Sequence, residues 1–183
     1  MSNIYKYIIY ILLSIFCKIY AEEIIFESNN INNFENVINE KSQNEENLIL
    51  RFKEKYYDMS NLSFERINLL INSNITFLGG YSDKTVFDFK NSYNGMMNIT
   101  YSNKTNIIVK FENIIFKNSG QYINQDDFML SVNFYSDENY LKFENCTFID
   151  NQYTLFKINM IYKNENNNIS NSDYFITFIN SNF

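Results

Sequence analysis

The stretch FENCTFIDN, residues 143–151, decides the fold, because its pattern of Phe, Asn and Phe occurs three times in the chain. The copies are NIIVKFENIIFKN from Asn106, NYLKFENCTFIDN from Asn139 and YFITFINSNF from Tyr174, and they align without gaps. A fourth, weaker copy begins at Asn74 with NITFLGG. The spacing between copies is 32 to 35 residues, a period that indicates stacked structural repeats.

Three sets of residues keep this spacing from copy to copy. The sets are Phe111, Phe143 and Phe178; Asn113, Asn145 and Asn180; and Phe116, Phe148 and Phe183. In stacked repeats, equivalent residues lie above one another, one strand spacing of about 4.8 Å apart. We therefore expect two columns of stacked Phe rings and a ladder of Asn side chains at a sharp turn between sheets, with the amide of Asn145 pointing inward.

Other strand-like runs lie between the copies. They occupy residues 86–89, 97–101, 128–135 and 154–162, and they alternate apolar and polar residues as strands with one buried face do. Each period then holds about three short strands. This predicts an all-β fold, a right-handed parallel β-helix (a solenoid), whose chain turns through three sheets in each coil. An antiparallel sandwich and a propeller are the alternatives, but a sandwich gives no reason for identity in register at this period.

The N-terminal residues 1–21 have the pattern of a secretory signal peptide. Lys6 precedes an apolar run of 11 residues, 7–17, and the small Ala21 stands before two glutamates. Lys18 ends the apolar run short of the ~20 residues that a membrane-spanning helix needs. We therefore expect a secreted or cell-surface protein that has no transmembrane span once the signal is removed.

Residues 22–47 are predicted to cap the open end of the β-helix with a strand and a short helix. Asn32 is the expected N-cap of this helix, and Phe34, Val37 and Ile38 lie on one helical face. Residues 48–183 are then the coils, beginning with a buried strand at 48–52. Because Phe183 closes the third copy, we expect a truncated β-helix, whose open C-terminal coil would otherwise favour end-to-end self-association.

Composition excludes several functions. The net charge is −6, and Lys and Arg are scattered, so the chain has neither a basic stripe for nucleic acid nor a polybasic membrane patch. It has no His, and Cys146 is the one Cys left after the signal, so zinc sites and nucleophilic triads are not expected. We predict no cofactor, no metal and no internal disulfide. Its 18 Phe and 15 Tyr exclude a disordered chain.

The chain is similar to the pectin-lyase-like right-handed β-helix proteins. Their order of strand, capping helix, strand, a phrase like NITFLGG and then TVFDF is the order of residues 24–89. FENIIFKN and FENCTFIDN also resemble the repeats of polymorphic outer-membrane proteins. The resemblance implies a fold that carries lyases, hydrolases, esterases, adhesins and spacers.

One candidate enzyme site lies in INQDDFML, residues 123–130. Asp126 and Asp127 resemble the paired acids of polygalacturonases, and with Gln125 they resemble the Gln and Asp of pectin methylesterases. The first family would add a His, and the second an Arg after the acids, whereas the only arginines here are Arg51 and Arg66. We favour a solvated loop at Asp126 and Asp127 and expect no catalytic activity.

Sequons for N-glycosylation occur at six positions: Asn61, Asn74, Asn98, Asn103, Asn145 and Asn168. An inward Asn145 would stay bare, and the other five are the expected acceptors, of which Asn103 and Asn168 are the best because their surroundings are polar. We expect a secreted, glycosylated, non-catalytic module for extracellular or cell-surface binding or adhesion, with a polysaccharide or cell-wall glycan as ligand. The alternatives are a structural spacer, and a polysaccharide lyase or glycoside hydrolase of the same fold whose catalytic part is missing or degenerate.

Overall fold

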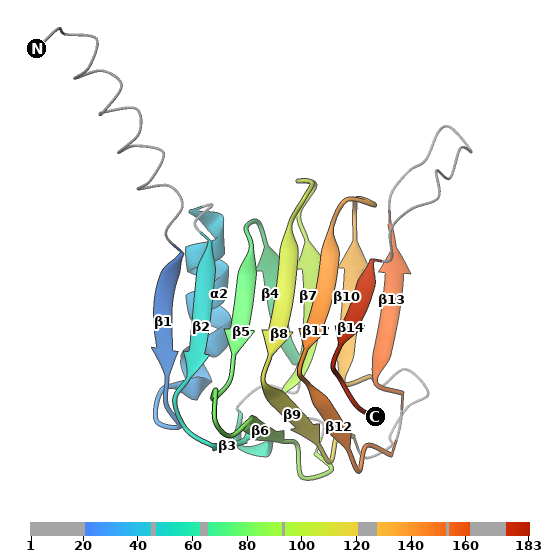
Figure 1. The fold of residues 1–183 in the computed structure, drawn as a ribbon. Coiled ribbons are helices and arrows are strands. Elements are labelled where there is room, and N and C mark those ends of the chain that lie inside the picture. The colour runs from blue at the N-terminus through green and yellow to red at the C-terminus, as the bar shows by residue number, and fades with distance from the viewer. Residues whose placement is uncertain are drawn as a thin grey trace, which may run out of the picture.

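The structure is a computed structural model of the chain, and it describes residues 21–44, 47–62, 66–92, 94–120, 128–152, 154–161 and 175–183. In this part of the chain the fold is all-β, built from three parallel sheets and one short α-helix (Figure 1). None of the described helices is long and apolar enough to cross a membrane.

The three sheets differ in which strand of each repeat they contain. Sheet A has, in spatial order, β1 (Glu22–Phe26), β2 (Leu48–Phe52), β5 (Ile75–Leu78), β8 (Ile108–Glu112), β11 (Tyr140–Glu144) and β14 (Ile176–Ile179). Sheet B has β3 (Tyr56–Asp58), β6 (Thr85–Asp88), β9 (Ile114–Lys117) and β12 (Thr147–Ile149). Sheet C has β4 (Arg66–Ile71), β7 (Met96–Tyr101), β10 (Leu130–Phe134) and β13 (Phe156–Met160).

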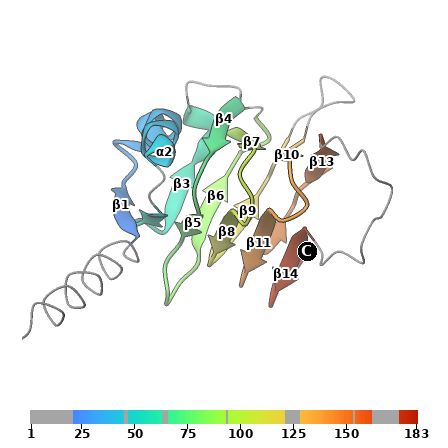
Figure 2. The ribbon, with the colours of Figure 1, turned by 90° about the horizontal axis from the view of Figure 1, so that it is seen from above.

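The chain visits sheets A, B and C in turn and then starts the next repeat. Neighbouring strands are parallel in every described pair, and Phe111 is in register with Phe77 on one side and Phe143 on the other. Figure 2 shows β5, β8, β11 and β14 following one another along one side, and β4, β7, β10 and β13 along the other. The prediction of an all-β fold with parallel strands is confirmed, and β3 and β4 are strands that were not predicted from the sequence.

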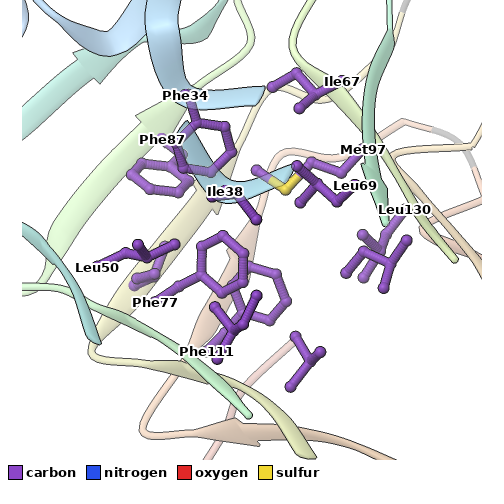
Figure 3. Packing of buried hydrophobic residues seen from close by; sticks show 14 of the residues in the cluster. Phe34, Ile38, Leu50, Ile67, Leu69, Phe77, Phe87, Met97, Phe111 and Leu130 are labelled. Carbon is purple, nitrogen blue, oxygen red and sulfur yellow. The ribbon is translucent and has the colours of Figure 1, made fainter. Parts of the chain in front are cut away.

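Helix α2 (Phe34–Gln43) covers one end of the stack, after a 3-10 turn, η1 (Ile31–Asn33). The helix buries Phe34 and Ile38 against the first repeats (Figure 3). The prediction that Asn32 is the N-cap is wrong, because Asn32 lies within η1 and the helix begins two residues later. Ile31 is buried, so the chain already turns at η1 to place this side chain in the core.

Helix α2 also protects the free edge of sheet C. The Asn39 side chain donates from Nδ2 to the carbonyl of Asn68 and accepts at Oδ1 from the amide of Leu70, both at 2.8 Å. The Ser42 hydroxyl accepts from the amide of Asn72 at 2.7 Å. These side chains therefore satisfy backbone groups of β4 and of the residue that follows it, which a further strand would otherwise pair with.

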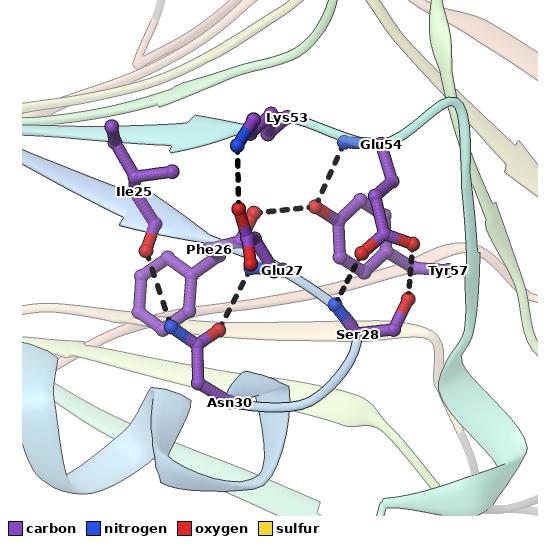
Figure 4. Close-up of polar contacts among 8 residues, drawn as sticks. All are labelled: Ile25, Phe26, Glu27, Ser28, Asn30, Lys53, Glu54 and Tyr57. Carbon is purple, nitrogen blue, oxygen red and sulfur yellow. Dashed lines mark hydrogen bonds and ion pairs between the residues drawn. The ribbon is translucent and has the colours of Figure 1, made fainter.

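A polar corner joins β1 to the turn between β2 and β3 (Figure 4). The buried Tyr57 hydroxyl donates to the carbonyl of Phe26 at 2.6 Å and accepts from the amide of Glu54 at 3.1 Å. Ser28 donates its backbone N–H to the Glu54 carboxylate at 2.8 Å. After β3, the 3-10 turn η2 (Met59–Asn61) leads toward sheet C. The corner holds the capping segment to the first repeat.

Stacked aromatic rings run through the core from repeat to repeat. One column has ring centroids 4.4, 5.2 and 5.0 Å apart along Phe77, Phe111, Phe143 and Phe178. A second column has separations of 5.1 and 4.8 Å along Phe116, Phe148 and Phe183. Both are nearly parallel stacks, the geometry expected of offset aromatic pairs. At the last repeat, the Phe178 and Phe183 residues are 40% and 71% exposed.

Candidate functional site

The Asn residues of the repeated phrase lie where the chain passes from sheet A to sheet B. Asn113, Asn145 and Asn180 follow β8, β11 and β14, and all three have left-handed backbone conformations, with φ of 59°, 52° and 50°. Asn tolerates this conformation better than other residues with a side chain. Asn118 and Asp150 share it after β9 and β12, at the next corner. A backbone requirement thus explains Asn at the repeated position.

Two of the corner amides are joined. Asn145 donates from Nδ2 to Oδ1 of Asn113 at 2.6 Å, and Asn113 is buried. The prediction that Asn145 points inward is wrong, because this residue is exposed. The corner needs a left-handed backbone, and Asn145 adopts this conformation while its residue stays exposed. In the weakest copy, Gly79 takes the equivalent position, but its backbone is not left-handed.

We expect Asn145→Ala to lower the free energy of unfolding by about 1–3 kcal/mol, since it adds left-handed strain and leaves Asn113 without this donor. Asn145→Gly removes the same hydrogen bond but suits the left-handed backbone, so it should recover about 1 kcal/mol of that loss. Urea denaturation of both variants measures the difference. Equal losses in the two would show that the backbone conformation is not the reason for Asn here.

Several predicted site residues lie outside the described residues. They are the signal segment 1–20, the acid pair Asp126 and Asp127, and the sequon at Asn168. Cys146 is described, and its side chain is buried in the core. Burial raises the pKa of its thiol to about 11, so the thiol stays protonated and unreactive at neutral pH.

The outer face of sheet B carries a cluster of two carboxylates. Asp58 and Asp88 are register partners on β3 and β6. The Asp88 carboxylate accepts from the Asn118 amide and the Lys90 backbone N–H, both at 2.9 Å, and from the Tyr56 hydroxyl at 3.1 Å. The Lys90 ammonium forms an ion pair with Asp58. Each carboxylate is therefore held by several donors.

These donors set the charge of both carboxylates. Burial raises the pKa of Asp88, but hydrogen bonds from Asn118, Lys90 and Tyr56 outweigh burial and hold this pKa below its ordinary value. Burial also raises the pKa of Asp58, and its bonds to Lys90 and Ser60 lower it by more. Both groups are ionised at neutral pH. Paired-carboxylate glycoside hydrolysis needs one protonated acid, and this pair does not supply one.

The lowered pKa values predict a loss of stability in acid. A folded-state pKa below the unfolded value gives stability that is present above the unfolded pKa, about 3.9 for Asp, and is lost as the pH falls through the folded pKa. Asp88→Asn keeps the acceptor for Asn118 and removes the charge. We expect the free energy of unfolding to fall less steeply between pH 5 and pH 3 in this variant than in the wild type. Urea denaturation of both proteins at several pH values in that range measures the two slopes of the free energy of unfolding against pH. Equal slopes would contradict a lowered pKa for Asp88.

A line of four Asn side chains on the outer face of sheet C was not predicted from the sequence. We call it the amide column, and its members are Asn68, Asn98, Asn133 and Asn159, one each from β4, β7, β10 and β13. Their intervals of 30, 35 and 26 residues are unequal, so the four positions do not recur at a single period in the sequence. Alternation within each strand was the available signal, since each Asn has apolar neighbours on both sides.

The amide column is a continuous chain of hydrogen bonds. Nδ2 of each Asn donates to Oδ1 of the Asn on the preceding strand, at 2.8 Å from Asn159, 3.2 Å from Asn133 and 3.2 Å from Asn98. Asn133 also donates to the Thr100 hydroxyl at 3.1 Å. Asn68 is exposed and the other three are half-buried, so the column is ordered by its own bonds and still faces solvent. Such a surface can exchange hydrogen bonds with a polar ligand.

Metal binding has no comparable support, because no group of three or more acidic, Cys or His side chains suited to an ion occurs among the described residues. No protein-family model, curated protein or solved structure matches the chain. Among the described residues, the amide column is the surface with the clearest binding chemistry.

Proposed function

We propose that this chain is a secreted, glycosylated and non-catalytic binding module whose ligand is a polysaccharide or cell-wall glycan. The amide column carries the proposal, because side-chain amides and sugar hydroxyls are both donors and acceptors of hydrogen bonds. The column spans four strands on an outward face, and its strands contain no Asp or Glu. A ligand that forms hydrogen bonds with the column therefore meets no carboxylate from these four strands.

The fold we propose is a right-handed parallel β-helix of the pectin-lyase-like type, with residues 1–21 as signal peptide, 22–47 as cap and 48–183 as coils. The repeated passage through three parallel sheets supports it, and so do the stacked Phe columns. End-to-end self-association remains a prediction that rests on the exposed Phe178 and Phe183 rings.

The lyase or hydrolase alternative gains no support from the acid pair on sheet B, because its donors hold the pKa of Asp58 and of Asp88 below the ordinary value. A structural spacer is the other alternative, and it needs no ordered polar surface. An array of plant and microbial polysaccharides separates these functions. We expect binding by the wild type without release of sugar, and silence across the array would reject the binding function.

The binding surface is tested with two matched variants. Asn133→Ala removes the central amide, which bonds to Asn98, Thr100 and Asn159, and we expect it to abolish the array signal. Asn36→Ala is the control, because Asn36 is an exposed residue of helix α2. This variant should leave the array signal unchanged. Equal signals from both variants would place the ligand elsewhere on the molecule.

Glycan occupancy is expected to differ among the sequons. Asn103 lies exposed in the turn between β7 and β8, whereas Asn98 is half-buried and its Nδ2 already donates to Asn68. Asn61 and Asn74 are exposed and are the other expected acceptors in the described residues. Asn145 is exposed as well, but its Nδ2 donates to Asn113, so we expect it to stay bare. Site-resolved mass spectrometry of the secreted protein should find Asn103 occupied and Asn98 largely bare. High occupancy at Asn98 would mean that the amide column is covered by the protein's own glycan.

A further inference from the structure

We propose that the amide column binds an uncharged, linear polysaccharide that runs across the strands of sheet C, from β4 toward β13. This inference rests on the proposed glycan-binding function and adds the class of ligand, its direction and the length needed for full binding. The length of the ligand follows from the spacing of the strands, and its lack of charge follows from the residues around the column. Its hydrogen bonding follows from the amides themselves.

The length of the column requires an extended ligand. Neighbouring parallel strands lie about 4.8 Å apart, so the amides of β4 and β13, three spacings apart, are separated by at least roughly 14 Å. The column also moves along the strands by two residues between β7 and β10, because Asn133 is in register with Thr100 and not with Asn98. A single sugar ring is too short to contact all four amides. A linear chain that follows the stacking direction meets one amide per strand, and its contacts with successive repeats add up.

The hydrogen-bond direction leaves the amides able to bind such a chain. Every bond in the column runs the same way, from Asn159 through Asn133 and Asn98 to Asn68, which polarises the amides cooperatively. Each accepting Oδ1 uses one lone pair for its neighbour and has a second. Sugar hydroxyls can therefore donate to the column without breaking it, and the ordered amides lose little side-chain entropy on binding.

The charges near the column favour an uncharged ligand. The strands of sheet C contain two cations, Arg66 and Lys157, and both already interact within the protein. The Lys157 ammonium, for example, lies 5.0 Å from the centre of the Phe128 ring. The whole chain has a net charge of −6, which repels polyanions. A uronic acid polymer would thus meet repulsion without a dedicated cation to offset it.

The test is calorimetric titration of the purified protein with β-1,4-linked glucose and mannose oligomers, from monomer to hexamer, and with uronic acid oligomers of the same lengths. We expect the affinity for at least one neutral series to rise with length up to about the tetramer, which spans the column, and then to level off. Uronic acid oligomers should bind at least about tenfold more weakly than neutral oligomers of equal length.

Variants assign the effect to the column. Asn159→Ala shortens it at the outermost described strand, where folding is least affected, and should weaken long oligomers by at least about tenfold while changing short ones little. Asn36→Ala is the control, and thermal melting verifies that each variant is folded. Binding that does not depend on length, or that prefers uronic acids, would overturn this inference and leave glycan binding intact. No binding to any oligomer or arrayed glycan would reject both.

Discussion

Replacing Phe143 by Ala is expected to lower the free energy of unfolding by about 3–5 kcal/mol. Phe143 is fully buried, and its ring stacks between those of Phe111 at 5.2 Å and Phe178 at 5.0 Å. Phe116 and Phe148 from sheet B contact its edge. Removing the ring leaves a cavity that rigid neighbouring strands cannot fill, so the loss includes both hydrophobic transfer and the empty volume.

The matched control is Phe178→Ala, because Phe178 belongs to the same column but is 40% exposed at the last repeat. We expect less than about half the loss, since less surface is buried and the site is open on one side. Urea denaturation with an unchanged m-value makes the comparison valid. A loss below about 0.5 kcal/mol for both Phe143→Ala and Asn145→Ala would be typical of surface positions and would contradict stacked repeats.

Gly79→Ala is expected to cost at least about 3 kcal/mol, or to prevent folding. A Cβ atom added at Gly79 would lie 2.2 Å from the carbonyl oxygen of Asn113 and 3.1 Å from Cβ of Thr85. The first of these atoms belongs to the backbone of the next repeat, and a backbone cannot move aside as a flexible side chain can. The Gly79 amide also donates to the Glu112 carbonyl at 2.8 Å, so a shift of the corner would break that bond.

Ser82→Ala is the control for Gly79→Ala, because Ser82 is exposed in the same turn between β5 and β6. Its expected effect is within about 0.5 kcal/mol. Thermal and urea denaturation of the two variants measure the difference. If Gly79→Ala were as stable as Ser82→Ala, the close approach of Gly79 to the Asn113 backbone would be wrong.

The repeated phrase made sheet A and its corners predictable. Phe111, Phe143 and Phe178 recur at nearly one period because each must fill the same volume above its neighbour. The corner Asn recurs because a left-handed backbone accepts few residues. Strands β3 and β4 lie outside the recurring phrase, β3 has three residues, and the sequence RINLLI of β4 contains neither Phe nor a corner Asn. Their assignment needed the partner strands.

The direction of side chains was harder to predict than their position. Asn145 was placed at its corner from sequence, yet the corner's geometry leaves it exposed while Asn113 is buried. Helix α2 was expected from its apolar face, but the buried Ile31 adds a 3-10 turn that moves its start to Phe34. Propensity and periodicity describe local structure, whereas exposure depends on what the neighbouring repeats cover.

Periodicity within the sequence was therefore enough to establish parallel β-strands, the stacked rings and the residues at the corners, because one chain packing on its own copies imposes the same demand at every repeat. Three features became visible only in the tertiary structure. They are the amide column, the pairing of Asp58 with Asp88, and the hydrogen bonds of Asn39 to the edge of β4. These contacts join residues of different strands and of the cap, at intervals that differ from one repeat to the next. Their hydrogen bonds depend on distances in three dimensions, which spacing along the chain does not specify.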